Sequence, residues 1–222
     1  MYESALPVCQ KRTAALCVAP GLATLYAAAL NRTSLKNRVF QWLQSAPHSF
    51  VASALAIGWT SEYELFDIKL AEPVSRNVAM EEMERALPPD LPILDARLVE
   101  DKHPALMGRL VMADYTIRLA GDVAPIHAAM EEYWAQDVVL AMRKTKSGEK
   151  QTNIRPMSIL LEKEPTGLYA RLMLTERETL KPDLLVATLA KMAGVELPQT
   201  RIHRLLLLGM DASGSPTPLL EL

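Results

Sequence analysis

Residues 138–161 read VVLAMRKTKSGEKQTNIRPMSILL, which is an apolar run, a basic turn and a second apolar run. Short apolar runs on either side of a Ser-Gly turn are typical of a β-hairpin. Between the runs lie five cations and one carboxylate, a surplus of four positive charges in a chain whose net charge is −2. The stretch therefore predicts neighbouring strands with a surface suited to an anion at their tip.

The C-terminal half around this hairpin shows an apolar periodicity that switches between the strand and the helix period. Asp122 is expected to cap a helix, and a second helix is expected to open at Pro182-Asp183 and to end at Gly194. The expected elements, in order, are strand 115–119, helix 122–134, strands 138–142, 157–161 and 168–174, helix 182–194 and strand 202–208.

The N-terminal half repeats the order. Ser75 is expected to cap a helix that Pro88-Pro89 stops. The expected elements are strand 14–18, helix 22–30, strands 50–57 and 62–70, helix 75–87 and strand 93–99. We therefore predict an α+β protein of two tandem ferredoxin-like (βαββαβ) units, residues 1–102 and 103–222. The Gly/Ser/Pro-rich segment after Gly209 is expected to be loosely held.

Composition narrows the classes of function. Half of the 222 residues are apolar and the sequence pI is near 6.1, which argues against a protein that coats nucleic acid by bulk charge. No apolar stretch approaches the roughly 18 residues of a membrane span, and the N-terminus lacks the pattern of a signal peptide. We expect a cytoplasmic protein with no membrane association.

The numbers of cysteines and histidines and the absence of two motifs argue against a metal site or a cofactor. Two cysteines exclude an iron–sulfur cluster held by three or four thiolates of this chain. Four histidines show no i,i+3 or i,i+4 pairing, so no zinc site is predicted. No glycine-rich phosphate loop and no G-x-S-x-G motif is present. We predict no cofactor, no metal site and no catalytic residue.

The cations around the basic turn are the candidate binding residues: Arg143, Lys144, Lys146, Lys150 and Arg155. One interpretation is contact with a phosphate or an RNA backbone, because lysine supplies a point charge and arginine a bidentate fork. The other is a solvated turn whose lysines protect an edge strand from pairing. Arg155 precedes Pro156 and lies beside apolar residues, so it is expected to be partly buried in an ion pair or a ligand contact.

The carboxylates and histidines outside the basic turn are mostly expected to have structural roles. Glu62, Glu64 and Asp67 could act as paired carboxylates, but a solvated sheet face is the expectation. His48 is a possible loop contact, while His103, His127 and His203 are expected to be structural. Aromatic residues make up 5% of the chain, and the predicted strands offer no obvious pair on which RNA bases would stack.

Four motifs in order resemble the radical-SAM-linked domain family of unknown function, over about residues 11–208. They are GWTSEYELFDI at 58–68, ALPPDLPILDA at 86–96, the hairpin TKSGEK at 145–150 with IRP at 154–156, and KPDLL at 181–185. Domains of that family are fused to, or encoded beside, B12-binding radical-SAM proteins. The resemblance implies a non-catalytic accessory protein that binds a partner or substrate of a separate radical-SAM enzyme.

Two departures from the family pattern are visible. Residues 18–21 read VAPG where the family carries Ser-His-Leu-Asp, and residues 42–45 read WLQS where it carries Gly-Phe-Asn-Pro. The first half is therefore expected to keep the fold but to lack the polar residues of these two family segments. The second half keeps the basic loop. The alternative function is RNA binding or processing through the basic hairpin, because tandem ferredoxin-like units recur in RNA-processing proteins.

Overall fold

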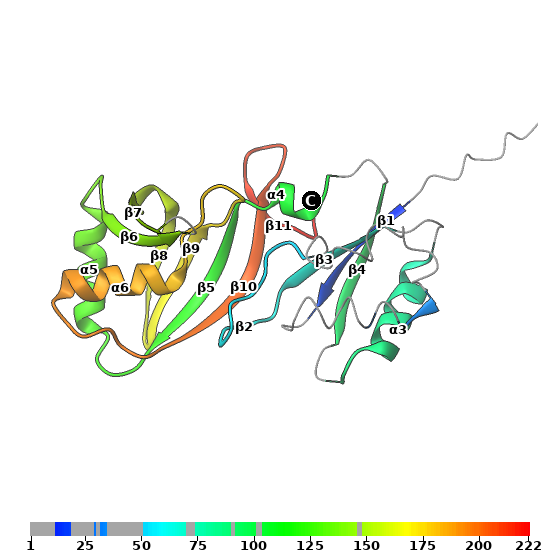
Figure 1. The fold of residues 1–222 in the computed structure, drawn as a ribbon, viewed down its shortest axis with the longest axis horizontal. Helices are drawn as coiled ribbons and strands as arrows, with labels where there is room; N and C mark the ends of the chain where they lie inside the picture. Colours follow the sequence, from blue (N-terminus) through cyan, green and yellow to red (C-terminus); the bar gives the residue numbers. More distant parts are fainter. Residues whose placement is uncertain are drawn as a thin grey trace, which may run out of the picture. The chain divides into compact units, whose positions relative to one another are not determined.

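The computed structural model describes residues 12–18, 29, 32–34, 51–69, 74–89, 92–100, 104–145 and 148–222 (Figure 1). These residues form an α+β fold whose sheets are mostly antiparallel. The chain divides into two compact units, residues 1–55 with 63–107, and residues 56–62 with 108–222. No helix in the described ranges has the length and apolar character needed to cross a membrane.

The first unit contains a three-stranded antiparallel sheet in the order β3-β1-β4. Its strands are β1 (Arg12–Val18), β3 (Glu64–Lys69) and β4 (Ile93–Glu100). Leu16 in the central strand lies opposite Phe66 on one side and Ala96 on the other. The expected strands 14–18 and 93–99 are therefore present with ends shifted by one or two residues.

Helix α3 (Arg76–Ala86) begins where the sequence predicts, because the Ser75 hydroxyl accepts a hydrogen bond from Val78 N at 3.4 Å. Ala79 and Met83 on this helix pack in a core with Phe66, Ile93 and Ala96. Val78 on the same helix is exposed. At the solvent edge, Arg76 Nε donates to Ala96 O at 2.8 Å, and its guanidinium lowers the pKa of the Asp95 carboxyl by hydrogen bonding to it.

The second unit is built on a larger sheet in the order β11-β10-β5-β9-β8, with β2 parallel to β10. The strands are β2 (Thr60–Ser61), β5 (Met112–Leu119), β8 (Ser158–Glu164), β9 (Gly167–Met173), β10 (Thr200–Met210) and β11 (Pro216–Pro218). Short helix α4 (Leu106–Arg109) precedes β5. Trp59, just before β2, packs edge-on against Tyr115 with ring centroids 5.8 Å apart.

Two helices cover one face of this sheet (Figure 1): α5 (Ala124–Trp134) and α6 (Pro182–Ala193). Helix α6 opens at Pro182 with Asp183 in its first turn and ends at Gly194 in the left-handed conformation, as predicted. Asp122 accepts a hydrogen bond from Ala124 N at 3.0 Å, although the N-cap residue itself is Val123. The buried helical residues are Ile126, Ala129, Met130, Tyr133, Leu185, Val186, Leu189 and Ala190.

The strands expected around the hairpin differ from those observed. The basic turn joins β6 (Leu140–Thr145) to β7 (Gly148–Asn153) and does not join 138–142 to 157–161. Among the described strands, β6 and β7 pair only with each other. Residues 148–153 read GEKQTN and contain no apolar side chain, so a search for apolar alternation misses this strand. The chain then passes through a 3-10 turn, η3 (Arg155–Met157), into β8.

Three further expectations need correction or fall outside the described residues. Residues 52–57 form no strand, and Val51 makes an isolated bridge with Phe66. The tail after Gly209 is packed, because β11 pairs with β10 and Leu219 is buried with its N–H donating to Leu207 O at 2.9 Å. The expected helix 22–30 lies outside the described residues apart from Ala29.

Gly167 sets the close approach of β9 to β5. A Cβ at this position would lie 1.9 Å from Ile117 O, so Gly167→Ala requires the strands to separate. We expect a loss of about 3 kcal/mol in unfolding free energy, measured by urea denaturation. The matched control is Gly108→Ala in α4, where a Cβ meets nothing within 4 Å, and it should stabilise by up to about 1 kcal/mol. Equal effects of the two substitutions would contradict this packing.

Candidate functional site

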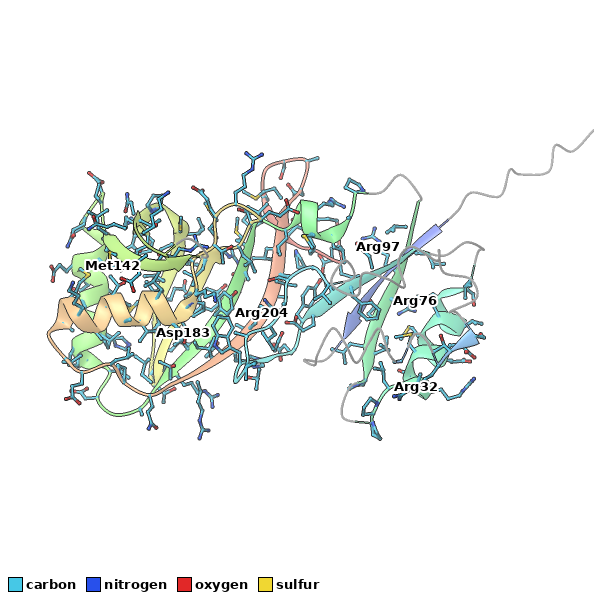
Figure 2. The ribbon with its side chains drawn as sticks, in the orientation of Figure 1. Arg32, Arg76, Arg97, Met142, Asp183 and Arg204 are labelled. Atoms are coloured by element: carbon cyan, nitrogen blue, oxygen red, sulfur yellow. The ribbon has the colours of Figure 1, made fainter. Side chains whose placement is uncertain are left out.

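The β6–β7 hairpin presents two different faces. Leu140 and Met142 project from one face and are 53% and 54% exposed, and Figure 2 labels Met142 at this end of the second unit. Ala141 is on the other face and is buried, and β6 packs beside α6. The hairpin is therefore held to the helical side of the unit by one face and leaves apolar side chains in solvent on the other.

Two of the predicted cations meet across the hairpin. Arg143 lies directly opposite Lys150, on the same face as Ala141. Neither side chain forms an ion pair with any described residue, and like charges directly opposite each other on a sheet are destabilising. Lys144 is in register with Glu149, while Lys146 lies outside the described residues.

Arg155 lies at the base of the hairpin, half-buried, in η3. Its guanidinium carbon is 3.8 Å from the centroid of the Trp134 ring and 5.9 Å from that of Tyr133. Nε is buried and has no hydrogen-bond partner in the described part of the chain. A guanidinium held over aromatic rings gains cation–π energy, and the Arg155 Nη groups, which have no partner among the described residues, stay available for an external acceptor.

Two polar side chains hold Arg155 in this position. Asn153 Oδ1 accepts hydrogen bonds from Val139 N at 2.9 Å and from Arg155 N at 3.2 Å, which closes the base of the hairpin. The buried Tyr133 hydroxyl donates to Ile154 O at 3.1 Å and shares a hydrogen bond of 2.7 Å with Ser158 Oγ. Burial raises the pKa of Tyr133, so its phenol stays protonated and remains a donor.

The remaining candidate residues are not brought to this site. Glu64 is 4% exposed, so the expected solvated sheet face is wrong for that residue. Asp67 Oδ2 accepts a hydrogen bond from Leu106 N at 2.9 Å. His127 makes a hydrogen bond of 2.7 Å to Gly167 O and His203 one of 2.7 Å to Thr60 Oγ1. His48 and His103 lie outside the described residues.

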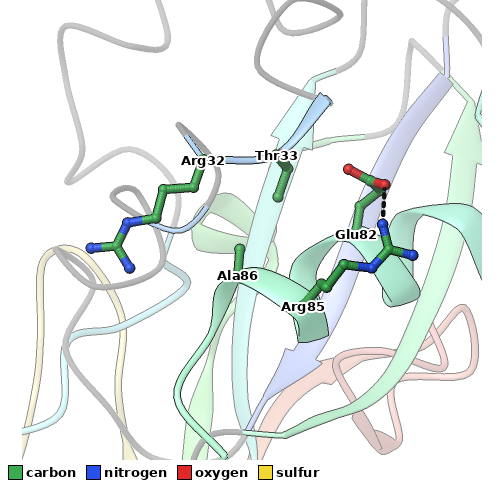
Figure 3. Close-up of a pocket in the computed structure, with 5 residues that line it drawn as sticks. All are labelled: Arg32, Thr33, Glu82, Arg85 and Ala86. Atoms are coloured by element: carbon green, nitrogen blue, oxygen red, sulfur yellow. Dashed lines mark hydrogen bonds and ion pairs between the residues drawn. The ribbon is translucent and has the colours of Figure 1, made fainter.

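A hollow of about 280 Å³ lies in the first unit (Figure 3) and is lined by Arg32, Thr33, Glu82, Arg85 and Ala86. Its charges are largely satisfied within the unit, because Glu82 accepts hydrogen bonds from Ser34 N at 3.0 Å and Arg85 Nη1 at 2.9 Å. The Ser34 backbone hydrogen bond is the main cause of the lowered pKa of Glu82. This hollow therefore offers less uncompensated charge than the hairpin.

Sequence reasoning did not identify the aromatic platform beneath Arg155. Tyr133 and Trp134 lie in the helix expected over 122–134, but their contact with Arg155 joins elements separated along the chain. Within the described residues, no group of three His, Cys, Asp or Glu side chains could hold a metal ion.

Comparison with known families places residues 22–182 in a family described as uncharacterized proteins conserved in bacteria (DUF2344). The chain belongs to this family. The matched region includes the hairpin, Arg155 and its aromatic platform, and it ends at the start of α6. No curated protein matches the chain. The family description carries no activity, so the function must be argued from the site.

The Tyr133 hydroxyl is predicted to be a stabilising group. Tyr133→Phe leaves the buried Ser158 hydroxyl and Ile154 O without this partner, which should cost about 1–3 kcal/mol in urea denaturation. Tyr169→Phe is the matched control, because the Tyr169 side chain is only part-buried and its hydroxyl neighbours, Asp114 and Arg171, keep two hydrogen bonds to each other. A cost for Tyr133→Phe no larger than that of the control would contradict the anchoring role.

Arg155 is predicted to contribute little to stability. Arg155→Met keeps an apolar stem over Trp134 and removes a buried, unpaired Nε, so unfolding free energy should be unchanged or higher by up to about 1 kcal/mol. Arg171→Met provides the contrast, because Arg171 forms two hydrogen bonds of 2.7 and 2.8 Å with buried Asp114. That variant should lose roughly 3 kcal/mol. A large loss with Arg155→Met would indicate that its charge serves the fold.

Proposed function

We propose that the chain is a non-catalytic accessory domain that binds an acidic segment of a partner protein through the β6–β7 hairpin. The observation that carries the proposal is Arg155, whose guanidinium is fixed over Trp134 and whose Nη groups form no hydrogen bond or ion pair with a described residue. A carboxylate of a partner would accept hydrogen bonds from these two Nη groups. The sequence resemblance suggests a separate radical-SAM enzyme, or its substrate protein, as the partner.

The apolar face of the hairpin favours a protein over a nucleic acid. Val138, Leu140 and Met142 are 56%, 53% and 54% exposed at and beside β6. Apolar side chains next to a fixed arginine are the usual composition of a protein interface, in which apolar anchors supply affinity and charges supply orientation. A phosphodiester backbone has no group that would bury these three side chains.

RNA binding is the second candidate function. It is favoured by the facing pair Arg143 and Lys150, which has no counter-charge among the described residues. It is disfavoured at this site by Trp134, because Arg155 already occupies the face of the indole on which a base would stack. RNA contact would then rest on phosphate charge alone and would be strongly dependent on salt.

We also propose that both units are ferredoxin-like. Support comes from the order β10-β5-β9-β8 in the second unit, where the chain runs β5-α5-β8-β9-α6-β10 with the hairpin inserted before β8. In the first unit, the order β4-β1-β3 together with the bridge from Val51 to Phe66 follows the same pattern. On this proposal the hairpin is an addition to the repeated unit.

The test is binding of the purified chain to the radical-SAM protein encoded nearest to its gene, measured by calorimetry, and to a tRNA, measured by gel retardation. Arg155→Met and the double variant Leu140→Ser, Met142→Ser should each weaken the protein complex about tenfold or more, which is about 1.4 kcal/mol. Arg177→Gln replaces an exposed arginine outside the hairpin and should leave binding unchanged.

The two candidate functions predict different patterns. Retardation of tRNA that falls steeply with salt, is lost in Arg155→Ala with Lys146→Ala, and is insensitive to the Leu140 and Met142 changes would establish RNA binding instead. Absence of a complex with the radical-SAM protein would refute the accessory function. A complex equally tight in wild type and Arg155→Met would refute the role given to Arg155.

A further inference from the structure

The sheet of the second unit has a second, polar face away from α5 and α6. Side chains alternate along β5 and β9, and the helical side receives buried Ile117, Leu168 and Ala170. The register places the remaining side chains in rows across the opposite face. One row contains Arg118 and Arg201, which face each other directly across β5 and β10.

Both arginines are exposed, and neither forms an ion pair with a described residue. Directly opposed residues have Cβ atoms about 5 Å apart, so two guanidinium groups can converge on one anion, whereas without an anion they repel each other. The third arginine of this face differs, because Arg171 is neutralised by a bidentate ion pair with Asp114 at 2.7 and 2.8 Å. Asp114 thus neutralises Arg171, whereas Arg118 and Arg201 have no carboxylate partner among the described residues.

Arg118 has no side chain opposite it on β9. Its partner there is Gly167, where a side chain is excluded because a Cβ would lie 1.9 Å from Ile117 O. In the adjoining row lie Tyr169, Thr116 and His203. The Tyr169 oxygen lies 3.4 Å from Arg171 Nη2, and burial together with Asp114 raises the pKa of Tyr169 to about 12, so the phenol stays protonated.

Groups of both charge signs lie around the pair Arg118 and Arg201, in separate places. His203 bonds to Thr60 Oγ1 through Nδ1, and its Nε2 is 3.8 Å from Glu62 Oε2. Glu162 and Glu164 lie on β8, the far strand of the sheet, opposite Tyr169 and Gly167, so both are two strands away from β5. Positive charge is therefore concentrated over β5 and β10, and negative charge lies toward β8 and at Glu62.

We propose that this face binds a terminal phosphate monoester between Arg118 and Arg201, with the hydroxyl group of Thr116 in the next row. Two guanidinium forks match a dianion, since a phosphate monoester carries a charge of about −1.5 to −2 at neutral pH. The site is separate from the hairpin, which packs with the helices on the opposite side of the sheet. The phosphate group belongs either to a small nucleotide or to the 5′ end of an RNA.

Calorimetry in buffers of equal ionic strength tests the site with four probes: inorganic phosphate, adenosine 5′-monophosphate, adenosine and a short RNA with or without a 5′-phosphate. Phosphate and the nucleotide should bind the wild-type chain, adenosine should not, and a preference for 5′-phosphorylated RNA over the free nucleotide would identify an RNA end as the source. Affinity should fall as pH drops below about 6, where the monoester becomes a monoanion.

The double variant Arg118→Gln, Arg201→Gln should weaken phosphate and nucleotide binding at least tenfold, and Arg118→Gln alone should have an intermediate effect. Arg177→Gln is the control and should bind these probes like the wild type. Far-UV circular dichroism checks that each variant is folded. Wild-type affinity in the double variant, no binding of any phosphate probe, or loss of binding in Arg177→Gln would overturn the site, and the first two results leave the hairpin proposal intact.

Discussion

The hydroxyl of Tyr133 is the constraint on which the hairpin site depends. It is buried in the last turn of α5 and connects the backbone just after β7 with the first residue of β8 through Ile154 O and Ser158 Oγ. A buried hydroxyl must find partners, so the end of the hairpin is fixed relative to the helix. Trp134 follows Tyr133 in the chain, and Arg155 follows Ile154. The hydrogen bond between Tyr133 and Ile154 therefore brings Trp134 into contact with Arg155.

Several of the described arginines fall into two groups with different energetics. Arg76 and Arg171 have carboxylate partners within their own unit and hold a helix or two strands together. Arg155, the pair Arg143 with Lys150, and the pair Arg118 with Arg201 have no described carboxylate partner. A cation held by aromatic rings or by strand register costs repulsion or desolvation that an external anion would relieve. This division is the physical basis for both proposed binding surfaces.

The family match covers residues 22–182, so it includes the hairpin but not β10. Only one of the two proposed surfaces therefore lies within the matched residues. The hairpin belongs to the part shared with the family, whereas the phosphate site needs Arg201, which lies beyond the matched residues. A member of the family could keep the first surface without the second, because the two are on opposite sides of the sheet.

Local chemistry made several features of this chain predictable. Ser75, Pro182 and Gly194 act on the adjacent turn of backbone as helix starts or stops. The ends of helices α3 and α6 could therefore be predicted from the sequence. The surplus of charge between 143 and 156 is likewise a property of composition. Strand β7 escaped prediction because its polar residues show no apolar alternation, and its pairing depends on β6 alone.

The sequence by itself determined the ends of helices α3 and α6 and where positive charge accumulates, because both depend on neighbours along the chain. Only the tertiary structure decided that Arg155 rests on Trp134, that Arg118 faces Arg201, and that the tail packs on β10. These contacts join residues distant in the chain. They follow from register and from packing at buried groups, which no local pattern encodes.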